Sequence, residues 1–536
     1  ELTTVIEESG SYSKWIKIKY WWWNKGLGLV IVVLFLLANI GVVIHSVLKN
    51  VYTQQCELLG MGLLVAKGGA AVINLNAMLI LLPVLSNVMT WLRGTWINNY
   101  IPIDRYISLH KLCASGLIIG SLAHCGAHFY NYYTLSSTPG EHLAEHGFPD
   151  YTPSTLFTSF PAITGFLMTL IMIVIVITSI ESIRRPHFEL FYYTHHLFII
   201  LFILLIFHGY TRQLKSEPTT YLWVTAPFVI YIVERAYRIV RGSRSVILHL
   251  AKQHPSKVLE LRMKKDNFKF KPGQFIYLNC PSLTRNEWHP FTITSSPDES
   301  FISVHINIVG NWTGRLYKLL NPNEKLGIVQ NEVMTGPDNS PILKIQGPFG
   351  AASEDVFKYK VVMLVGAGIG ATPFASILKH IKYRLVQSLD EQRQKGNNTY
   401  LPIQKVYFFW ISREKNSFEW FTFILHDVET ELNDLVEIHT YLTGAIEVSD
   451  WNAIVEGLAT IDSESHTDFI TGLKSQTMFG RPNWSGIFQE VVRLHKESSI
   501  GVFFCGPRPM AKEIRSNCHR FNGMEGCNLH FYKENF

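Results

Sequence analysis

The chain has 536 residues, 47% of them hydrophobic and 17% charged, and a formal net charge of +6. This length exceeds that of a single domain, and so modest a charge excludes a protein built around nucleic-acid binding. Long apolar runs dominate up to about Arg241, whereas charged residues, glycines and short strand-like runs alternate beyond it. The sequence therefore predicts a membrane half followed by a soluble half.

Six apolar segments have lengths suited to membrane-spanning helices. They cover residues 27–47, 61–85, 107–130, 163–183, 190–208 and 221–237. Basic residues precede the first segment and lie between segments 2 and 3 and segments 4 and 5, but residues 130–161 contain none. The positive-inside rule then places residues 1–26, these two loops and the soluble half in the cytosol. Because the chain begins with Glu1 and not with Met, we expect that it has been trimmed.

Four histidines form two pairs in the third and fifth segments: His110 with His124, and His195 with His208. Each pair spans roughly 20 Å along a helix, which fits within a hydrocarbon core of about 30 Å. Two imidazoles from facing helices can ligate one haem iron, and filling both axial positions suits electron transfer. Since no Cys-x-x-Cys-His motif occurs, we expect two haems that are not covalently attached.

The second pair does not fit a straight helix. At about 100° per residue, His208 lies about 140° from His195 and about 120° from His196, whereas His124 lies only about 40° from His110. The fifth segment must therefore bend, bulge or rotate, and spacing alone does not choose between His195 and His196.

The next region carries short strand-like runs at residues 245–250, 258–263, 275–279 and 303–309. Between them stands His289-Pro290-Phe291-Thr292. The Thr292 hydroxyl can bond a flavin ring or its phosphates, and His289 can support the chain of that cofactor. The alternative for this short motif is a plain junction of loop and strand.

A stronger nucleotide signature follows. The apolar run 361–365 predicts a buried strand, and an amphipathic helix is expected from about 373 to 385. Between them lies a glycine-rich turn containing Gly366, Gly368, Gly370, Thr372 and Pro373. Its backbone amides can approach a pyrophosphate at the helix N-terminus. The spacing is not that of the plain Rossmann fingerprint, and tight packing alone is the alternative explanation.

Further strands at 405–410 and 500–505 alternate with helices and predict a parallel sheet. Arg413 follows the first of these strands, where an adenosine ribose would lie. Its guanidinium can bind a 2′-phosphate and so select NADPH, or it is an exposed surface charge. The second strand ends in Cys505-Gly506-Pro507.

Together these motifs resemble the NADPH oxidase family, most closely its phagocyte-type branch. The resemblance rests on the four histidines, His-Pro-Phe-Thr at 289–292, Gly-Pro-Phe-Gly at 347–350, the glycine-rich turn at 366–373, Cys-Gly-Pro at 505–507 and Lys-Glu-Asn-Phe at 533–536. It covers nearly the whole chain from Leu27 onward.

The resemblance implies an α-helical, six-span transmembrane haem bundle (27–241) followed by a ferredoxin-reductase-like dehydrogenase. That dehydrogenase would comprise an antiparallel β-barrel FAD domain (242–355) and an α/β NADPH-binding domain (356–536). The resemblance selects His195 over His196. It assigns His110 and His195 to the inner haem, and His124 and His208 to the outer haem.

The resemblance also implies roles near the flavin and at the oxygen site. Phe536 would cover the flavin ring until nicotinamide displaces it, and Cys505 and Glu534 would lie near the hydride path. Lys67 stands where the family usually has an arginine near the outer haem; it keeps the charge but loses the planar fork. Lys67 and His128 are candidates to stabilise the anion formed from oxygen. Both are equally interpretable as packing residues, and His128 also as a rival haem ligand or polar wall.

Two further departures concern Asn307, which replaces an arginine frequent in the second flavin strand, and the short loop 209–220, which lacks the cysteines of the phagocyte branch. Taken together, the motifs and the resemblance predict an NADPH oxidase of a plasma or phagosomal membrane. It would pass electrons from cytosolic NADPH through FAD and two b-type haems to dioxygen, forming superoxide. Activating subunits or an upstream regulatory module are further partners. The alternatives are a ferric-chelate reductase of the same architecture and a proton-conducting channel.

Overall fold

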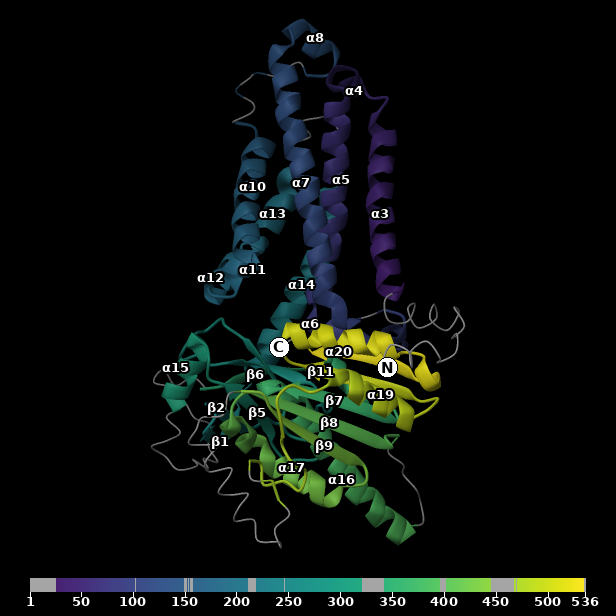
Figure 1. The fold of residues 1–536 in the computed structure, drawn as a ribbon. Coiled ribbons are helices and arrows are strands. Elements are labelled where there is room, and N and C mark those ends of the chain that lie inside the picture. Colours follow the sequence, from purple (N-terminus) through teal and green to yellow (C-terminus); the bar gives the residue numbers. More distant parts are fainter. Residues whose placement is uncertain are drawn as a thin grey trace. The chain divides into compact units, whose positions relative to one another are not determined.

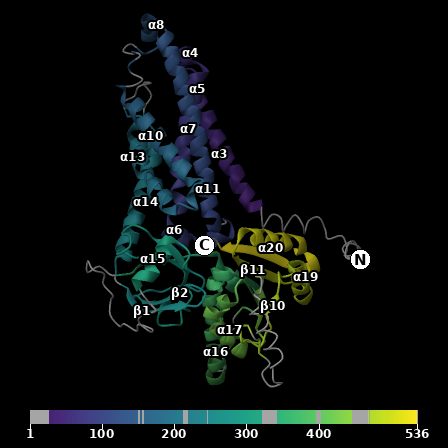
Figure 2. The same ribbon diagram turned by 60° about the vertical axis from the view of Figure 1, so that its left-hand side comes forward.

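The computed structural model describes residues 26–101, 103–148, 152, 154, 158–210, 218–244, 246–320, 342–395, 402–444, 467–468 and 470–534. The chain divides into two compact units, with Leu27–Tyr237 in one and Arg238 onward in the other (Figures 1 and 2). We describe each unit by itself.

The first unit is helical throughout its described residues. Its longer helices are α3 (Leu27–Asn50), α5 (Met61–Ile80), α6 (Ser86–Arg93), α7 (Tyr106–Ser137), α10 (Phe160–Ser179), α12 (Phe188–His195), α13 (Phe198–His208) and α14 (Thr220–Gly242). Short helices α4 (Gln54–Leu59), α8 (Gly140–Glu145) and α11 (Glu181–Arg184) connect them.

Five helical stretches are long and apolar enough to cross a membrane: Leu27–Asn50, Met61–Val84, Ile103–Ser137, Phe160–Ser179 and Phe188–His208. They coincide with the first five predicted segments. α14 forms where the sixth was predicted, but its C-terminal half carries four charged residues, Glu234, Arg235, Arg238 and Arg241. This charge explains why α14 is less apolar than the other five.

Helices α5 and α7 lie side by side in both views (Figures 1 and 2). Glycines allow this approach: a Cβ placed on Gly69 would lie 2.8 Å from the carbonyl oxygen of Gly120 and 2.9 Å from the backbone nitrogen of His124. The close packing brings backbone carbonyls of α5 within reach of side chains on α7.

The fifth predicted segment is interrupted. α12 ends at His195, His196 and Leu197 form a turn, and α13 begins at Phe198. Two helices that meet at a turn do not share one helical phase, so the angular conflict between His195 and His208 disappears. The predicted break in this segment is confirmed.

The second unit begins with two three-stranded antiparallel sheets. The first has the order β1 (Ile247–His254), β2 (Val258–Lys264), β5 (Ile302–Asn307), and the second has the order β4 (His289–Thr292), β3 (Phe275–Asn279), β6 (Lys344–Phe349). Both sheets contribute to one buried core, which α15 (Asn311–Leu320) joins through Trp312 and Leu316. The predicted strands of this region are present within a few residues.

A six-stranded parallel sheet follows. Its order is β10 (Met478–Phe479), β9 (Val436–Leu442), β8 (Lys405–Ser412), β7 (Val361–Ala367), β11 (Ser499–Cys505), β12 (Asn528–Glu534). Its helices are α16 (Thr372–Lys395), α17 (Glu419–Glu431), α19 (Trp484–Leu494) and α20 (Arg508–Phe521). α16 and α17 pack into one hydrophobic cluster, and α19 and α20 into another. The chain builds outward from β7 in one direction and then from β11 in the other, so the topology switches between these two strands. Open α/β sheets bind ligands at such switch points.

Candidate functional site

The four predicted histidines meet as two pairs inside the helical unit. The ring centroids of His110 and His195 are 6.2 Å apart, and those of His124 and His208 are 6.3 Å apart. Two imidazoles that bind one metal ion from opposite sides, at about 2.0–2.1 Å each, have ring centroids roughly 6.3 Å apart. Both pairs therefore fit bis-histidine coordination of one metal centre each, as two haems would require.

Each of these histidines has its Nδ1 atom close to a polar atom of a neighbouring helix. The distances are 2.9 Å from His110 to the carbonyl of Ile80, 2.8 Å from His124 to that of Ala66, 2.9 Å from His208 to Thr164 Oγ1, and 3.5 Å from His195 to Ser179 Oγ. A carbonyl only accepts, so Nδ1 of His110 and of His124 carries the proton. Their Nε2 atoms are left unprotonated and could ligate a metal.

The hydroxyl partners lead to the same conclusion for the other two rings. Thr164 donates its only hydroxyl proton to the carbonyl of Phe160 at 2.7 Å, and Ser179 donates to Ile175 at 2.6 Å. These oxygens can then only accept from the histidines. Sequence reasoning missed Thr164 and Ser179 because no motif marks them.

The structure separates His195 from its rival His196. His196 Nδ1 donates to the carbonyl of Tyr192 at 2.7 Å, and its Nε2 lies 3.5 Å from Arg235 of α14. His195, not His196, faces His110. Both nitrogens of His196 are thus engaged away from the pair.

His128 and Lys67 lie beside the outer pair. The His128 ring meets the His124 ring edge-on, with centroids 4.5 Å apart, whereas His124 is the ring that faces His208. Lys67 directly follows Ala66, whose carbonyl binds His124, and its side chain is half-buried. The geometry favours His128 as a wall of this site over His128 as a ligand.

The predicted flavin motif forms strand β4. His289 stacks on the indole of Trp312, with ring centroids 4.2 Å apart at 29°. Phe291 also stacks on Trp312, at 6.1 Å. Thr292 is buried and pairs in register with Phe275, next to the Lys271–Gln274 turn. Trp312 thus fixes His289 and Phe291 of this motif, a role that nothing in the sequence marked.

The glycine-rich turn lies at the switch point of the parallel sheet. Cys505 pairs in register with Gly366 on one side and with Glu534 on the other. A Cβ on Gly370 would overlap the carbonyl oxygen of Cys505, and one on Gly506 would lie 2.8 Å from Ala367 Cβ. The two predicted motifs, 366–373 and 505–507, therefore pack directly against each other.

Two interactions fix the backbone around this turn. Gly368 has a φ of +55°, and its carbonyl accepts a 3.0 Å hydrogen bond from the Trp410 indole. α16 then begins at Thr372, which is buried, with Pro373 in its first turn. The turn thus opens onto a helix N-terminus, where backbone amides favour a phosphate.

Glu534, in β12, is hydrogen-bonded to Ser353, which follows β6 of the antiparallel sheets. Its Oε1 accepts hydrogen bonds from the backbone nitrogen of Ser353 at 2.6 Å and from the Ser353 hydroxyl at 2.7 Å. Ser353 lies just after the Gly-Pro-Phe-Gly motif, and Gly273, with a φ of +82°, leaves room for it. Phe536 lies outside the described residues.

Burial raises the pKa of the Cys505 thiol, and the nearby charge of Glu534 adds to this effect. The thiol is therefore protonated at neutral pH, which makes it a poor nucleophile.

Arg413 follows the carboxyl end of β8 directly and is exposed. Its backbone carbonyl faces Gly444, where any Cβ would clash, so the loop after β9 packs against it. The guanidinium makes no ion pair with any residue of the described part of the chain. It is thus available to an anionic group at this edge of the sheet.

Three family models match the chain in succession. They are a ferric reductase-like transmembrane component (residues 67–206), an FAD-binding domain (244–353) and a ferric reductase NAD-binding domain (359–519). Among solved structures, a ferredoxin–NADP+ reductase from Plasmodium falciparum has 13% identity, covers 54% of this chain and 95% of its own, and has a TM-score of 0.33.

Curated relatives span the whole arrangement. The chain is 47% identical to one superoxide-generating NADPH oxidase heavy chain of Dictyostelium discoideum, over 97% of this chain and 75% of that protein. It is 45% identical to a second such heavy chain of the same organism, over 97% and 99%. It is 34% identical to human NADPH oxidase 3, over 96% and 99%. At these identities and coverages, the chain belongs to the NADPH oxidase family.

Proposed function

We propose that this chain is a transmembrane NADPH oxidase, which takes electrons from NADPH in the cytosol and delivers them to dioxygen on the opposite face, forming superoxide. One observation carries the proposal. The same chain has two facing histidine pairs in its helical unit and a glycine-rich turn at the switch point of its parallel sheet. The names of the relatives support oxygen as the acceptor.

In the membrane unit, His110 and His195 would hold an inner b-type haem, and His124 and His208 an outer one. Haem bound there supplies one-electron steps. The chain's own contribution is orientation: the contacts to Ile80, Ala66, Thr164 and Ser179 hold each imidazole with Nε2 directed at the metal. Because two histidines would hold each haem iron, a haem bound there would supply electron transfer and not an oxygen-binding site on iron.

In the dehydrogenase unit, the glycine-rich turn would bind the pyrophosphate of NADPH, and Arg413 its 2′-phosphate. FAD bound in this unit would supply a hydride acceptor that can pass electrons on singly. Thr292 and His289 would contact this flavin, Cys505 and Glu534 would border the nicotinamide, and Phe536 would cover the flavin ring.

At the outer face, negative charge develops as oxygen is reduced. A positive group in a low-dielectric site stabilises such charge. Lys67 and His128, beside the outer pair, are the side chains we assign to this task. We infer that the dehydrogenase lies on the cytosolic side of a plasma or phagosomal membrane. Activating subunits would reach it there.

The test uses the purified chain under argon. NADPH should reduce both haems, giving a low-spin spectrum with two haems per chain, and admitted oxygen should reoxidise them with superoxide as product. Superoxide is scored as dismutase-sensitive reduction of cytochrome c. One haem per chain, or no reduction by NADPH even after cytosol is added, would contradict the proposal.

Ferric-chelate reduction is the second candidate, because two of the matching family models are described as ferric reductase components. The same preparation separates the two candidates. Chelator-dependent iron reduction that dismutase leaves unchanged would favour the reductase. Activity that appears only when cytosol is added to membranes would reveal an activating partner.

A further inference from the structure

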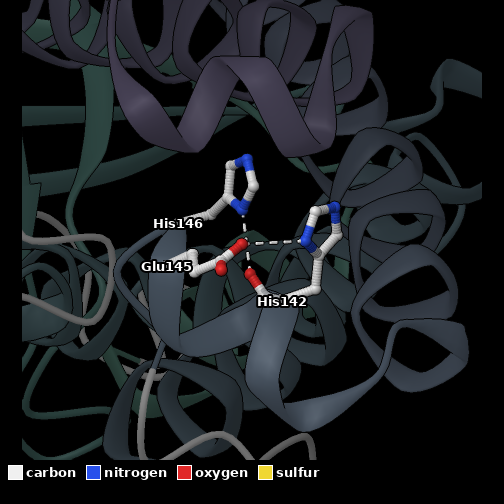
Figure 3. Close-up of side chains that lie close together, drawn as sticks. All are labelled: His142, Glu145 and His146. Atoms are coloured by element: carbon white, nitrogen blue, oxygen red, sulfur yellow. Dashed lines mark hydrogen bonds and ion pairs between the residues drawn. The ribbon is translucent and has the colours of Figure 1, made fainter.

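The connection between α7 and α10 brings together three side chains that the electron path does not use. These are His142, Glu145 and His146, on α8 and at its C-terminus (Figure 3). One potential ligand atom from each lies within 4.8 Å of the other two. We propose that these three residues bind one divalent transition-metal ion, and that Zn²⁺ is the best-fitting ion.

The spacing of the three residues places them on one side of a single helical turn. His142 and Glu145 are three residues apart, and His142 and His146 are four apart. His142 Nδ1 lies 3.1 Å from Glu145 Oε2, and the two imidazole centroids are 4.7 Å apart. The His146 ring is also tied to the His142 carbonyl, 2.8 Å from its Nδ1. The ligand groups are thus already gathered.

The turn that carries them has a defined end. Gly147 has a φ of +89°, the Phe148 amide donates to the Leu143 carbonyl at 2.8 Å, and the Gly147 amide donates to Ala144 at 3.2 Å. These two bonds form a Schellman motif, which closes a helix with a left-handed residue. His146 occupies the C-cap position, so its backbone is fixed relative to His142 and Glu145.

The same turn is docked on the rest of the helical unit. Leu143 and Phe148 are 5% and 7% exposed and belong to a buried cluster with Cys56, Leu59, Leu63 and Leu135. These two residues also form the hydrophobic contact that accompanies a Schellman motif. The apolar side of α8 therefore faces α4, α5 and α7, which leaves the two histidines and Glu145 toward solvent.

The chemistry of this ligand set indicates the ion. Two imidazoles and one carboxylate, with a water as fourth ligand, form a recurrent Zn²⁺ site. Imidazole disfavours Mg²⁺ and Ca²⁺, which require oxygen ligands. Residues 130–161 contain no lysine or arginine that would repel a cation at this site. Because His142 and Glu145 are exposed and His146 is only half-buried, exchange of their present hydrogen bonds for metal bonds requires little desolvation.

A buried cluster of the same composition lacks this capacity. His254, Glu260 and His305 lie within ligand range of one another, but their groups are already engaged. Glu260 accepts from His254 Nε2 at 3.1 Å and from Arg262 Nε at 2.6 Å. Arg262 supplies there the positive charge that an ion would bring. We therefore place the metal site at α8 alone.

The experiment uses the purified chain in detergent, stripped with EDTA and dialysed against micromolar Zn²⁺. Bound zinc is measured by elemental analysis. We expect one zinc per chain, released again by EDTA, with competition from Cu²⁺ but not from Mg²⁺ or Ca²⁺. Zinc should also raise the melting temperature of the wild type. His142→Ala should weaken binding at least tenfold, since even loss of a supporting contact costs 10–100-fold in metal affinity.

Two controls keep the outcome interpretable. Glu141→Gln, on the same helix, and His187→Ala, an exposed histidine elsewhere, should bind zinc as the wild type does. The combined variant His142→Ala, Glu145→Gln, His146→Ala should lose the zinc while its haem spectrum stays unchanged, which shows that it is folded. Stoichiometric zinc in that variant, or none in the wild type, would overturn the proposal.

Discussion

Replacement of Gly69 by alanine should loosen the outer histidine pair. A Cβ at this position would lie 2.8 Å from the Gly120 carbonyl oxygen and 2.9 Å from the His124 backbone nitrogen, both rigid backbone atoms. To restore ordinary contact, α5 and α7 must separate by roughly half an ångström, in an interior that is close-packed. Overpacking of this kind costs about 1–3 kcal/mol. If the whole cost falls on the His124 site, haem there is held roughly 5- to 150-fold less tightly.

The neighbouring Gly68 provides the matched control. A Cβ on Gly68 meets only Val43 Cγ1, at 3.5 Å, which is ordinary van der Waals contact. The assay incubates each purified variant with an excess of a haem-scavenging apoprotein and follows the haem that remains per chain. Gly69→Ala should lose one haem faster while retaining the other, and Gly68→Ala should behave as the wild type. Equal loss from the two variants would refute the packing argument.

Four other changes test the remaining assignments. Thr164→Val removes the acceptor of His208 Nδ1 and should weaken outer-haem retention about 10- to 100-fold, measured by the same scavenging assay; unchanged retention would show that the contact is incidental. Arg413→Ala should reduce the preference for NADPH over NADH roughly ten- to hundredfold in kcat/KM, and an unmoved ratio would leave Arg413 as a surface charge. Lys67→Met should retain both haems and their reduction by NADPH but slow reoxidation by oxygen in stopped flow; equal rates would assign Lys67 to packing. Burial raises the pKa of the Cys280 thiol to about 11 and also raises the pKa of Cys505 and Cys518. As the pH rises, these thiols therefore lose their protons first in the unfolded chain. The free energy of unfolding should fall as the pH rises above about 8.5. Thermal unfolding across this range measures the fall, which should be smaller in a variant with all three cysteines replaced by alanine.

The sequence predicted elements and ligands where a periodic pattern or a glycine-rich turn carries the information. The helical phase of His195 and His208 even required the break that the structure has at His196 and Leu197. Contacts between residues distant in the chain have no corresponding pattern in the sequence. The stack of Trp312 on His289 and the bonds from Ser353 to Glu534 join positions that share no local motif. They follow from how α15 and the segment after β6 pack against the strands, which a single sequence does not specify.

The hydrogen bonds from α7 to α5 have a consequence for how the two haem sites can change. His110 binds the carbonyl of Ile80 and His124 that of Ala66, so a step of fourteen residues on one helix is matched by fourteen on its antiparallel neighbour. Ile80 ends α5, where a carbonyl has no helical partner, so the inner bond also caps a helix. The equal residue spacing on α5 and α7 keeps both hydrogen bonds in register. A one-residue insertion between Ala66 and Ile80 would leave one histidine aligned and rotate the partner of the other by about 100°. Substitutions can therefore tune either site alone, but the length of this segment cannot change without uncoupling the two.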